Sequence, residues 1–478
     1  MDYTKIGLKA GLEIHQQLDT GRKLFCHCPS YLRNDKPDFV IHRKLHKVVG
    51  ETGEIDIAVN YEAALDKEFE YQAYDDSTCL VEYDECPPYD LDRTALDEAL
   101  KIALLLNCEI YSVSQIMRKT VIDGSNTSGF QRSALIAHNG YVETSFGKVG
   151  IETIAIEEDA ARIVEKGEKK AVYRLDRLGI PLIEVTTKPD MNNPEQVKEA
   201  ALKIGEILRA CRVKRGIGTI RQDLNISIKG HERVEIKGFQ EPRMMIETIN
   251  KEIGRQKDEI AKGKINGEVR GAKEDGSSEF LRPMPGMARM YPETDLPLLK
   301  IGREKINLLK KTLPKMRHEL RAELKKKGVN EELIELALDD MDEFNILMKV
   351  YSKDASLIVK MISLWRSELA AKLKKSVEEV KDILSEAVLE KILLALKDGR
   401  VSEGDVKGIM SAIAGGRSVE EALKVEKVSA DALEEEITKI VKEKPGLKAN
   451  AYMGLVIAKL GAGIDKRKAM EILSRIAK

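Results

Sequence analysis

The sequence has little that is typical of a membrane protein, a disulfide-rich secreted protein or a broadly basic nucleic-acid binder. Its 478 residues include one tryptophan and six cysteines, and no apolar run is long enough to cross a bilayer. The formal net charge is −1, so no overall basic field attracts nucleic acid, although a local patch could still bind RNA. The opening MDYTKIGLKAG has no signal-peptide pattern. We therefore expect a cytoplasmic protein with no membrane partner.

Several common catalytic motifs are also missing. The chain contains no G-x-x-x-x-G-K-[ST] phosphate-binding loop, no G-x-S-x-G motif and no Ser-Ser-Lys amidase signature. If this protein handles phosphoryl groups, it must do so with carboxylates, a metal ion and basic side chains on another scaffold.

Four of the six cysteines form two close pairs. Cys26 and Cys28 lie in LFCHCPS, and Cys79 and Cys86 lie in STCLVEYDECPP. Six cysteines are too sparse for a disulfide scaffold, whereas four thiols in two pairs could hold a structural zinc ion. Because the spacings differ from the common C-x2-C knuckle, zinc-free thiols remain the alternative interpretation.

The composition of the chain changes near residue 298. Before this point, β-rich segments such as IPLIEVTT mix with helical ones such as TALDEALKIALLLNC, which predicts an α+β fold with a largely antiparallel sheet and flanking helices. After it, strand patterns disappear and helix-capping boxes begin at Ser376, Ser402 and Ser418. The predicted domains are a cradle domain over 1–298, a helical domain over 299–402 and a helical tail domain over 403–478.

Glutamate and histidine alternate with apolar residues in GLEIHQQLD. A period of two predicts a half-buried strand, with Leu12 and Ile14 on one face and Glu13 and His15 on the other. The polar face is either exposed to solvent, which is the commoner case, or forms the floor of a cleft.

Acidic residues occur in or beside two later apolar strands. Glu184 lies within IPLIEV, where an unpaired buried carboxylate would be costly, so it needs a partner or a metal ion. Glu157, Glu158 and Asp159 end the β-rich run IETIAIEED. These acids are candidates for a phosphoryl-transfer site.

Other polar residues predict a wide polar cleft. A Gly/Ser/Asn loop in RKTVIDGSNTSGFQRS, which could bind phosphate through backbone N–H groups, is flanked by Arg118, Lys119, Gln131 and Arg132. Polar residues also alternate along two strands and occupy a proline-bounded turn. They are Arg221, Asp223, Asn225 and Ser227 in TIRQDLNISI, Glu235 and Lys237 in RVEIKGFQEP, and Glu293 and Asp295 in RMYPETDLP.

Seven ordered segments resemble the GatB/GatE family of tRNA-dependent amidotransferase subunits. They are GLEIHQQLDTGRKLFCHCPS, NTSGFQRS, IEEDAAR, LDRLGIPLIEVTTKPD, GIGTIRQDLNISI, VEIKGFQE and LRPMPGMARMYPETDLP. The resemblance is closer to the E-type members of archaeal-type glutamyl-tRNA(Gln) amidotransferases than to the bacterial B-type members, and it implies a YqeY-like helical tail. Most E-type members also carry an aspartyl-tRNA-synthetase-like inserted domain, for which AKGKINGEVRGAKEDGSSEF leaves no room.

The resemblance implies a two-step activity. ATP phosphorylates the γ-carboxylate of glutamate on tRNA(Gln), and ammonia from an asparaginase-like D-type partner then displaces the phosphate. The absence of an amidase nucleophile agrees with this division of labour. The expected assembly is a heterotetramer of two D-type and two E-type chains. The alternatives are a B-type member of a three-component complex that also accepts aspartyl-tRNA, and a non-catalytic tRNA-binding adaptor.

The resemblance also assigns roles to individual residues. Glu13, His15, Glu158 and Glu184 are the implied catalytic ligands of Mg²⁺, with Mn²⁺ as a second possibility and Glu157 as the alternative to Glu158. The side chains expected to contact ATP and the acyl phosphate are Arg118, Lys119, Gln131, Arg132, Arg221 and Lys237. Cys26, Cys28, Cys79 and Cys86 remain candidates for zinc.

Overall fold

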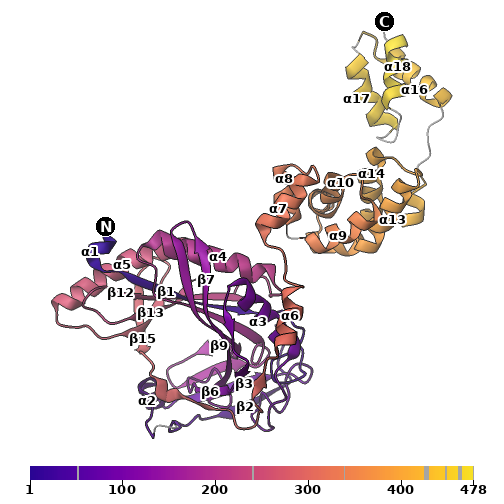
Figure 1. Cartoon of the computed structure of the whole chain (residues 1–478). Coiled ribbons are helices and arrows are strands. Elements are labelled where there is room, and N and C mark those ends of the chain that lie inside the picture. Colours follow the sequence, from indigo (N-terminus) through magenta and orange to yellow (C-terminus); the bar gives the residue numbers. More distant parts are fainter. Residues whose placement is uncertain are drawn as a thin grey trace. The chain divides into compact units, whose positions relative to one another are not determined.

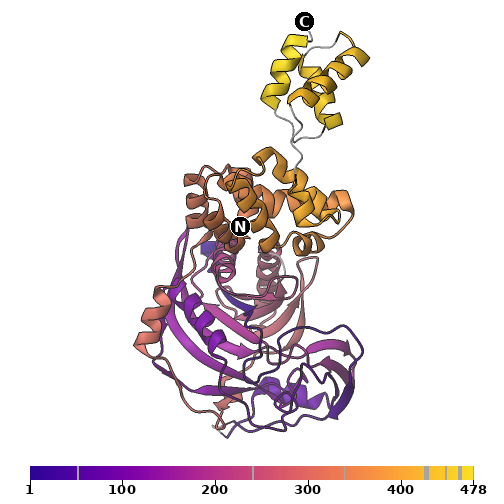
Figure 2. The same cartoon turned by 90° about the vertical axis from the view of Figure 1, so that its right-hand side faces the viewer.

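The chain consists of two compact units, Met1–Met316 and Arg317–Lys478, which are drawn in Figures 1 and 2. The computed structural model describes all residues except 51–52, 240–241, 339, 425–429, 447–448, 461–465 and 477–478. The finer division into 1–298, 299–402 and 403–478 stays a prediction, and parts of the predicted tail lie outside the described residues.

The first unit is built on a large sheet that has β1 near its centre. The strand order is β15-β14-β13-β12-β1-β11-β8-β7-β6-β16, and β4 pairs with β7. Among the described residues, β14 runs parallel to β13 and the other paired strands of this sheet are antiparallel, as the sequence predicts. The strands are β1 (Lys9–Gln17), β4 (Glu109–Ile110), β6 (Ile116–Thr120), β7 (Phe130–Thr144), β8 (Gly147–Glu158), β11 (Pro181–Thr187), β12 (Ile220–Ser227), β13 (Val234–Phe239), β14 (Glu268–Ala272), β15 (Ser278–Pro283) and β16 (Met290–Pro292).

Three amphipathic helices cover one face of this sheet. Helices α3 (Arg93–Leu105), α4 (Pro194–Ala210) and α5 (Pro242–Ala261) pack on its strands, and α4 and α5 are seen along the sheet in Figure 1. Leu12 and Ile14 of β1 are fully buried in the resulting core, and burial of each side chain contributes roughly 1.5–3 kcal/mol. The period-two pattern of β1 therefore places Glu13 and His15 on the face that the helices do not cover.

A smaller sheet accompanies the large one. Its order is β2-β3-β10-β9, and Tyr71, Tyr173 and Leu175 lie in its separate core. Its strands are β2 (Phe39–Arg43), β3 (Glu68–Ala73), β9 (Arg162–Lys166) and β10 (Lys170–Arg174). The remaining elements of the first unit are α1 (Tyr3–Ile6), α2 (Ile57–Ala64), β5 (Val113–Ser114), η1 (Met287–Arg289), β17 (Leu299–Lys300) and α6 (Arg303–Lys310). The short strand β17 extends the strand content slightly beyond residue 298.

The β7–β8 hairpin contains an irregularity that matters for the site. The two strands are out of simple register between Leu135 and Ala137, where an extra residue forms a β-bulge. Beyond the bulge, Ser133 pairs with Glu157. The register on this side therefore decides which acid of the pair Glu157 and Glu158 faces which side of the sheet.

The second unit is helical. A core that extends from Leu324 to Ala422 and a separate core around Tyr452 lie in its described part. The predicted capping boxes at Ser376, Ser402 and Ser418 are all present. Its elements are α7 (Arg317–Lys326), α8 (Glu331–Ala337), α9 (Met341–Val350), α10 (Ala355–Val359), η2 (Lys360–Leu364), α11 (Trp365–Leu373), α12 (Val377–Ile383), α13 (Glu386–Lys397), α14 (Glu403–Ala414), α15 (Val419–Ala422), α16 (Ala430–Glu443), α17 (Ala449–Leu460) and α18 (Lys466–Ile476). Among all described residues of the chain, no helix has both the length and the apolar composition that crossing a bilayer requires.

Candidate active site

The face of the large sheet without helices is polar. His15 of β1 pairs with Glu184 of β11 on one side and with Arg221 of β12 on the other, and Glu13 pairs with Asp223. Directly opposed residues of antiparallel strands project to the same face. The register therefore brings together side chains that are distant in the sequence.

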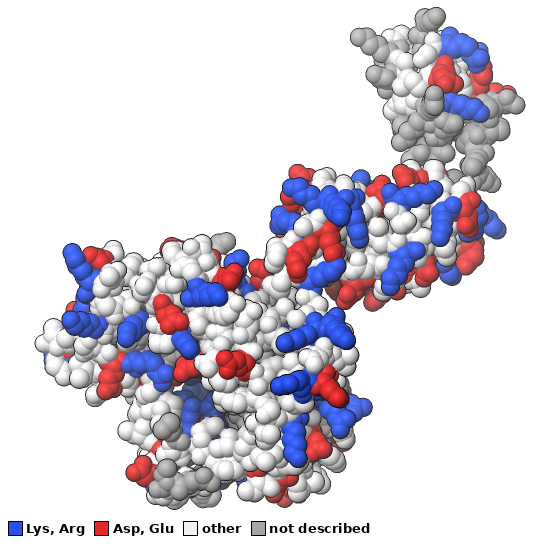
Figure 3. All heavy atoms as spheres, viewed as in Figure 1, with Lys and Arg blue, Asp and Glu red and all other residues white. Residues whose placement is uncertain are grey.

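This polar face lines a hollow of about 390 Å³, a size typical of small-molecule sites. Figure 3 shows a recess in the first unit with basic side chains inside it. The residues that line the hollow are Glu13, His15, Lys119, Val121, Gln131, Glu157, Asp159, Ala160, Leu182, Arg221, Asp223, Glu235, Lys237, Gly238, Arg282, Pro285 and Arg289. Of the two interpretations of GLEIHQQLD, the structure supports the floor of a cleft.

Carboxylates surround His15 at the bottom of this face. Its Nε2 atom lies 3.2 Å from an oxygen of Glu184 and 3.5 Å from an oxygen of Glu13. Potential ligand atoms of His15, Glu157 and Glu184 lie within 4.8 Å of one another, and so do those of Glu13, His15 and Asp223. Clustered carboxylate oxygens with one imidazole suit Mg²⁺ or Mn²⁺. The side chains present therefore fit a divalent cation.

The acids of this cluster differ in protonation. Burial, and then the neighbouring charge of Glu184, raises the pKa of Glu13 to about 7. Burial also acts to raise the pKa of Glu184, but Lys119 and His15 outweigh it and bring that pKa below its ordinary value. Burial would lower the pKa of His15, and the hydrogen bond and charge of Glu184 raise it instead. His15 and Glu184 thus form an ion pair, and Glu13 holds its proton more readily.

Lys119 and Gln131 approach the cluster from β6 and β7. The Lys119 ammonium lies 3.4 Å from Glu157 and 3.7 Å from Glu184. The Gln131 amide donates to a carboxylate oxygen of Glu157 at 3.1 Å. Both side chains therefore lie where the sequence analysis placed them, next to the acids.

Lys237 and Arg221 reach the hollow from β13 and β12. The Lys237 ammonium lies 2.7 Å from Asp223 and 2.5 Å from Glu235, and the Arg221 guanidinium donates to Asp159 at 2.8 Å. Each cation on this wall is thus held by a carboxylate, which fixes its position toward the open volume.

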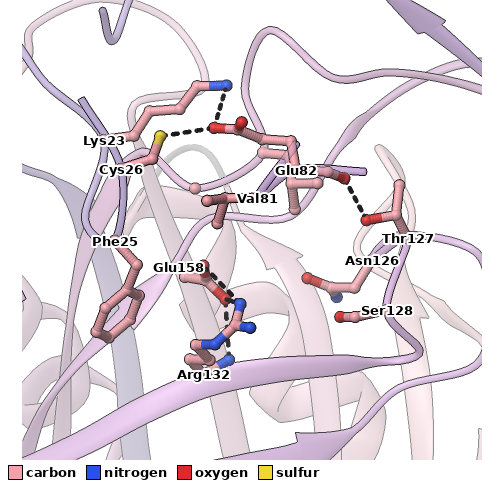
Figure 4. Close-up of a pocket in the computed structure, with 12 residues that line it drawn as sticks. Lys23, Phe25, Cys26, Val81, Glu82, Asn126, Thr127, Ser128, Arg132 and Glu158 are labelled. Carbon is pink, nitrogen blue, oxygen red and sulfur yellow. Dashed lines mark hydrogen bonds and ion pairs between the residues drawn. The ribbon is translucent and has the colours of Figure 1, made fainter. Parts of the chain in front are cut away.

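The structure corrects the choice between Glu157 and Glu158. Glu157 lies beside His15 and Glu184, whereas Glu158 projects to the other face of β8 because neighbouring residues of a strand alternate. Glu158 accepts a hydrogen bond from the Arg132 backbone at 3.2 Å and lies 3.4 Å from its guanidinium. Figure 4 shows this carboxylate directed at Arg132.

Arg118 and Arg132 are likewise placed outside the hollow, contrary to the sequence-based expectation. They are paired across β6 and β7, and their guanidinium groups both donate to the fully buried Glu293, at 2.6–2.9 Å and 2.8 Å respectively. Arg118 also lies over the ring of Phe130 at 4.5 Å. The two arginines complete a buried ion-pair network on the other face of the sheet.

A second candidate metal site lies near this network. Ligand atoms of Cys26, Cys28, Cys79 and Glu82 lie within 4.8 Å of one another. The thiol of Cys26 lies 2.9 Å from Glu82, which also contacts the buried ammonium of Lys23 at 3.1 Å (Figure 4). Three sulfur atoms and one carboxylate oxygen suit tetrahedral zinc.

Cys86 does not join the other three cysteines. It is exposed and lies outside the group, whereas Glu82 occupies the fourth place. The turns between Cys79 and Cys86 direct the earlier side chain inward, because the Cys79 N–H donates to Glu82 at 2.9 Å. The predicted four-cysteine set is thus corrected to three cysteines and a glutamate.

Sequence reasoning missed two arginines and undervalued three acids. Asp159, Asp223 and Glu235 line the hollow, and the alternating pattern already drew attention to the last two. Arg282 and Arg289 lie at the end of β15 and in η1, where no periodic pattern signals which way a side chain points.

Comparison with known proteins identifies the class of this chain. Residues 8–307 match the profile described as the GatB/GatE catalytic domain. This segment contains the whole hollow and the three-cysteine cluster. The chain belongs to the GatB/GatE family.

Relatives named as E-type components of glutamyl-tRNA(Gln) amidotransferases match over nearly the full length. The one from Methanocaldococcus jannaschii is 35% identical over 634 positions, which cover 99% of each chain. The one from Methanococcus maripaludis is 33% identical and covers 91% of this chain and 90% of its own. That of Methanothermobacter thermautotrophicus is 52% identical over 54% of this chain and 41% of its own. The first alignment is longer than the 478 residues present here, so that relative contains segments that this chain lacks.

Proposed function

We propose that this chain converts glutamyl-tRNA(Gln) to glutaminyl-tRNA(Gln) as the ATP-dependent component of an amidotransferase. The observation that carries the proposal is the hollow in which carboxylates gather around His15 beside Lys119 and Lys237, within the segment that matches the family's catalytic domain. The names of the full-length relatives supply the substrate class.

The first proposed step is a phosphoryl transfer. An oxygen of the tRNA-bound glutamate γ-carboxylate attacks the γ-phosphorus of ATP, an O–P bond forms, and the bond to the ADP oxygen breaks. Lys119 and Lys237, held by their carboxylate partners, stabilise the charge on the phosphoryl oxygens.

The second proposed step is an amidation. The lone pair of ammonia attacks the γ-carbon of the acyl phosphate, inorganic phosphate leaves with the electrons of the C–O bond, and the nitrogen loses a proton. Glu13, whose pKa is raised to about 7, is placed to accept a proton near neutral pH.

The donor set in the hollow would hold a divalent cation. The residues proposed as its ligands are Glu13, His15, Glu157 and Glu184, so that Glu157 takes the place of Glu158 in the sequence-based set. Bound Mg²⁺, or Mn²⁺ as favoured by the histidine, would supply neutralisation of phosphate charge.

The remaining parts of the assembly are proposed from the relatives and from the sequence. The relatives are named as one component of a larger enzyme, and the chain's lack of an amidase motif supports an asparaginase-like D-type partner that supplies ammonia through a channel. We propose two copies of each component. A YqeY-like helical tail would contribute to tRNA binding, and a charged tRNA substrate places the reaction in the cytoplasm.

The test replaces the partner by free ammonium. The full chain is incubated with ATP, Mg²⁺, ammonium and labelled glutamyl-tRNA(Gln), and the amino acid released from the tRNA is identified. We expect glutamine from the wild type and none from Glu184→Gln. The matched control is Glu152→Gln, because Glu152 is an exposed glutamate on the same sheet.

Two negative outcomes have different meanings. Binding of the tRNA without glutamine formation, even after addition of an asparaginase-like partner, would contradict the enzymatic proposal and favour a tRNA-binding adaptor. Glutamine formation that Glu184→Gln leaves intact would keep the function and refute the proposed site.

We also propose that Cys26, Cys28, Cys79 and Glu82 hold a zinc ion. Elemental analysis of the purified protein should find about one zinc per chain, and Cys26→Ser with Cys79→Ser should lose it. Cys86→Ser is the control and should retain the metal, because Cys86 lies outside the donor group. Zinc loss in Cys86→Ser would refute the ligand set.

A further inference from the structure

Arg282 and Arg289 differ from the other cations around the hollow. Lys119, Lys237 and Arg221 each form an ion pair with a carboxylate. Within the described part of the chain, neither the Arg282 nor the Arg289 guanidinium has a hydrogen bond or an ion pair, yet both residues line the open volume. The hollow therefore has a wall on which two guanidinium groups are left without an anion.

The backbone that carries these arginines is held firmly. The Gly286 N–H donates to Asp56 at 2.6 Å, and Asp56 also accepts from the first turn of α2. A Cβ atom added at Gly50 would lie 2.1 Å from the Ala288 carbonyl, so the two backbones are in close contact there. The guanidinium groups are thus presented from a fixed loop rather than from a free one.

Acids near the two arginines do not neutralise them. Asp56, Glu62 and Asp123 line a small side cavity of about 40 Å³ that the arginines also border. The Asp56 oxygens are used by backbone N–H groups, and no ion pair joins any of these acids to either arginine among the described residues. Burial, and then the positive charge of Arg282, lowers the pKa of Arg289.

Two adjacent cations without a counter-ion are costly in a partly buried site, and an arginine keeps its charge at any physiological pH. An anion with several oxygens would offset this cost, because each guanidinium fork can bind two phosphate oxygens. The carboxylate cluster elsewhere on the lining would hold the cation that accompanies such a polyphosphate.

We infer that Arg282 and Arg289 form a phosphate-binding subsite that receives the phosphate chain of the nucleotide. This inference rests on the proposed function. It assigns the two arginines the oxygens of ATP, while Lys119 and Lys237 remain with the acid cluster.

The test measures ligand binding without turnover. The full chain is titrated calorimetrically with ADP, tripolyphosphate and adenosine in Mg²⁺ buffer at fixed ionic strength. Arg282→Gln and Arg289→Gln should each weaken ADP and tripolyphosphate about 10- to 100-fold, and adenosine binding should stay the same. Arg289→Lys should fall between, because it keeps the charge and loses the fork. Arg303→Gln, at an exposed arginine that begins α6, should bind as the wild type does.

Stability provides a second reading. Without ligand, both glutamine variants should melt no lower than the wild type, because each removes an unpaired charge. A large fall in melting temperature would mean that the arginines hold the fold, and it would overturn the inference.

Other outcomes separate the inference from the function on which it rests. Equal ADP and tripolyphosphate affinities in wild type and variants would overturn the subsite, even if glutamine is formed. Weaker binding of deacylated tRNA with unchanged ADP binding would overturn it too, because the arginines would then contact RNA phosphates. A wild type that binds ADP through both arginines but forms no glutamine would leave the subsite standing and refute the function.

Discussion

Three neighbouring strands carry two very different groups of charges on their two faces. Adjacent residues are separated onto opposite sides of the sheet by the strand alternation. The hollow receives Lys119, Gln131 and Glu157, and the opposite face receives Arg118, Arg132 and Glu158.

The difference between the faces lies in how completely the charges are satisfied. Glu293 is fully buried and binds both Arg118 and Arg132, and the adjoining cavity of about 10 Å³ has room for about one water molecule. On the other face, about 390 Å³ of open volume adjoins acids grouped for a ligand. Residue type alone therefore does not separate structural from functional charges here; the open volume does.

The strongest test exchanges the two adjacent glutamates. Glu157→Gln should lower the rate of glutamine formation about 10²- to 10³-fold with little change in melting temperature, because it removes a proposed cation ligand at an open site. Glu158→Gln should lower the melting temperature and keep the rate within about tenfold. Single-turnover assays and calorimetry measure the two effects, and the reverse result would mean that the faces are assigned wrongly.

A second large effect is expected at the closed network. Glu293→Gln removes the anion shared by Arg118 and Arg132, so the free energy of unfolding should fall by about 3–5 kcal/mol. Hydrogen exchange in β6 and β7 of the full chain localises the loss. Unchanged protection there would contradict the view that this network holds the sheet together.

The pH dependence of stability should follow from the same carboxylate. Burial acts to raise the pKa of Glu293, but the hydrogen bond from Arg118 and the charge of Arg132 bring it below its ordinary value. A lowered pKa stabilises the fold above the pKa of the unfolded chain, and this contribution disappears as the pH falls through the lower value. The melting temperature should therefore drop on acidification below about pH 4.5, and less steeply in Glu293→Gln. Parallel profiles would contradict this.

The smallest effect is expected from the other acidic partner of Arg118. Asp295 lies 3.2 Å from that guanidinium, but its side chain is 47% exposed. Asp295→Asn should cost less than about 1 kcal/mol. A loss as large as that from Glu293→Gln would show that exposure does not separate the two contacts.

The sequence predicted the parts of the site that depend on local pattern. Alternation along GLEIHQQLD predicted the polar face of β1, and the apolar surroundings of Glu184 marked it as an acid in need of a partner. The α+β organisation and the three capping boxes also follow from short-range physics.

The remaining parts depend on contacts that no local pattern encodes. Arg118 and Arg132 find Glu293 more than 160 positions away along the chain, so their use in the closed network could not be foreseen. The turns after Cys79 decide that Glu82, and not Cys86, meets the other thiols.

The bulge between Leu135 and Ala137 also constrains how the length of this hairpin can change during evolution. The hairpin tip at Ser145 and Phe146 is far along the strands from the site, so insertions there leave the facing of Glu157 untouched. A single inserted residue between the bulge and the Glu157 end would exchange the two adjacent glutamates. Length variation should therefore be tolerated at the tip and rejected beyond the bulge, even where each individual residue type is preserved.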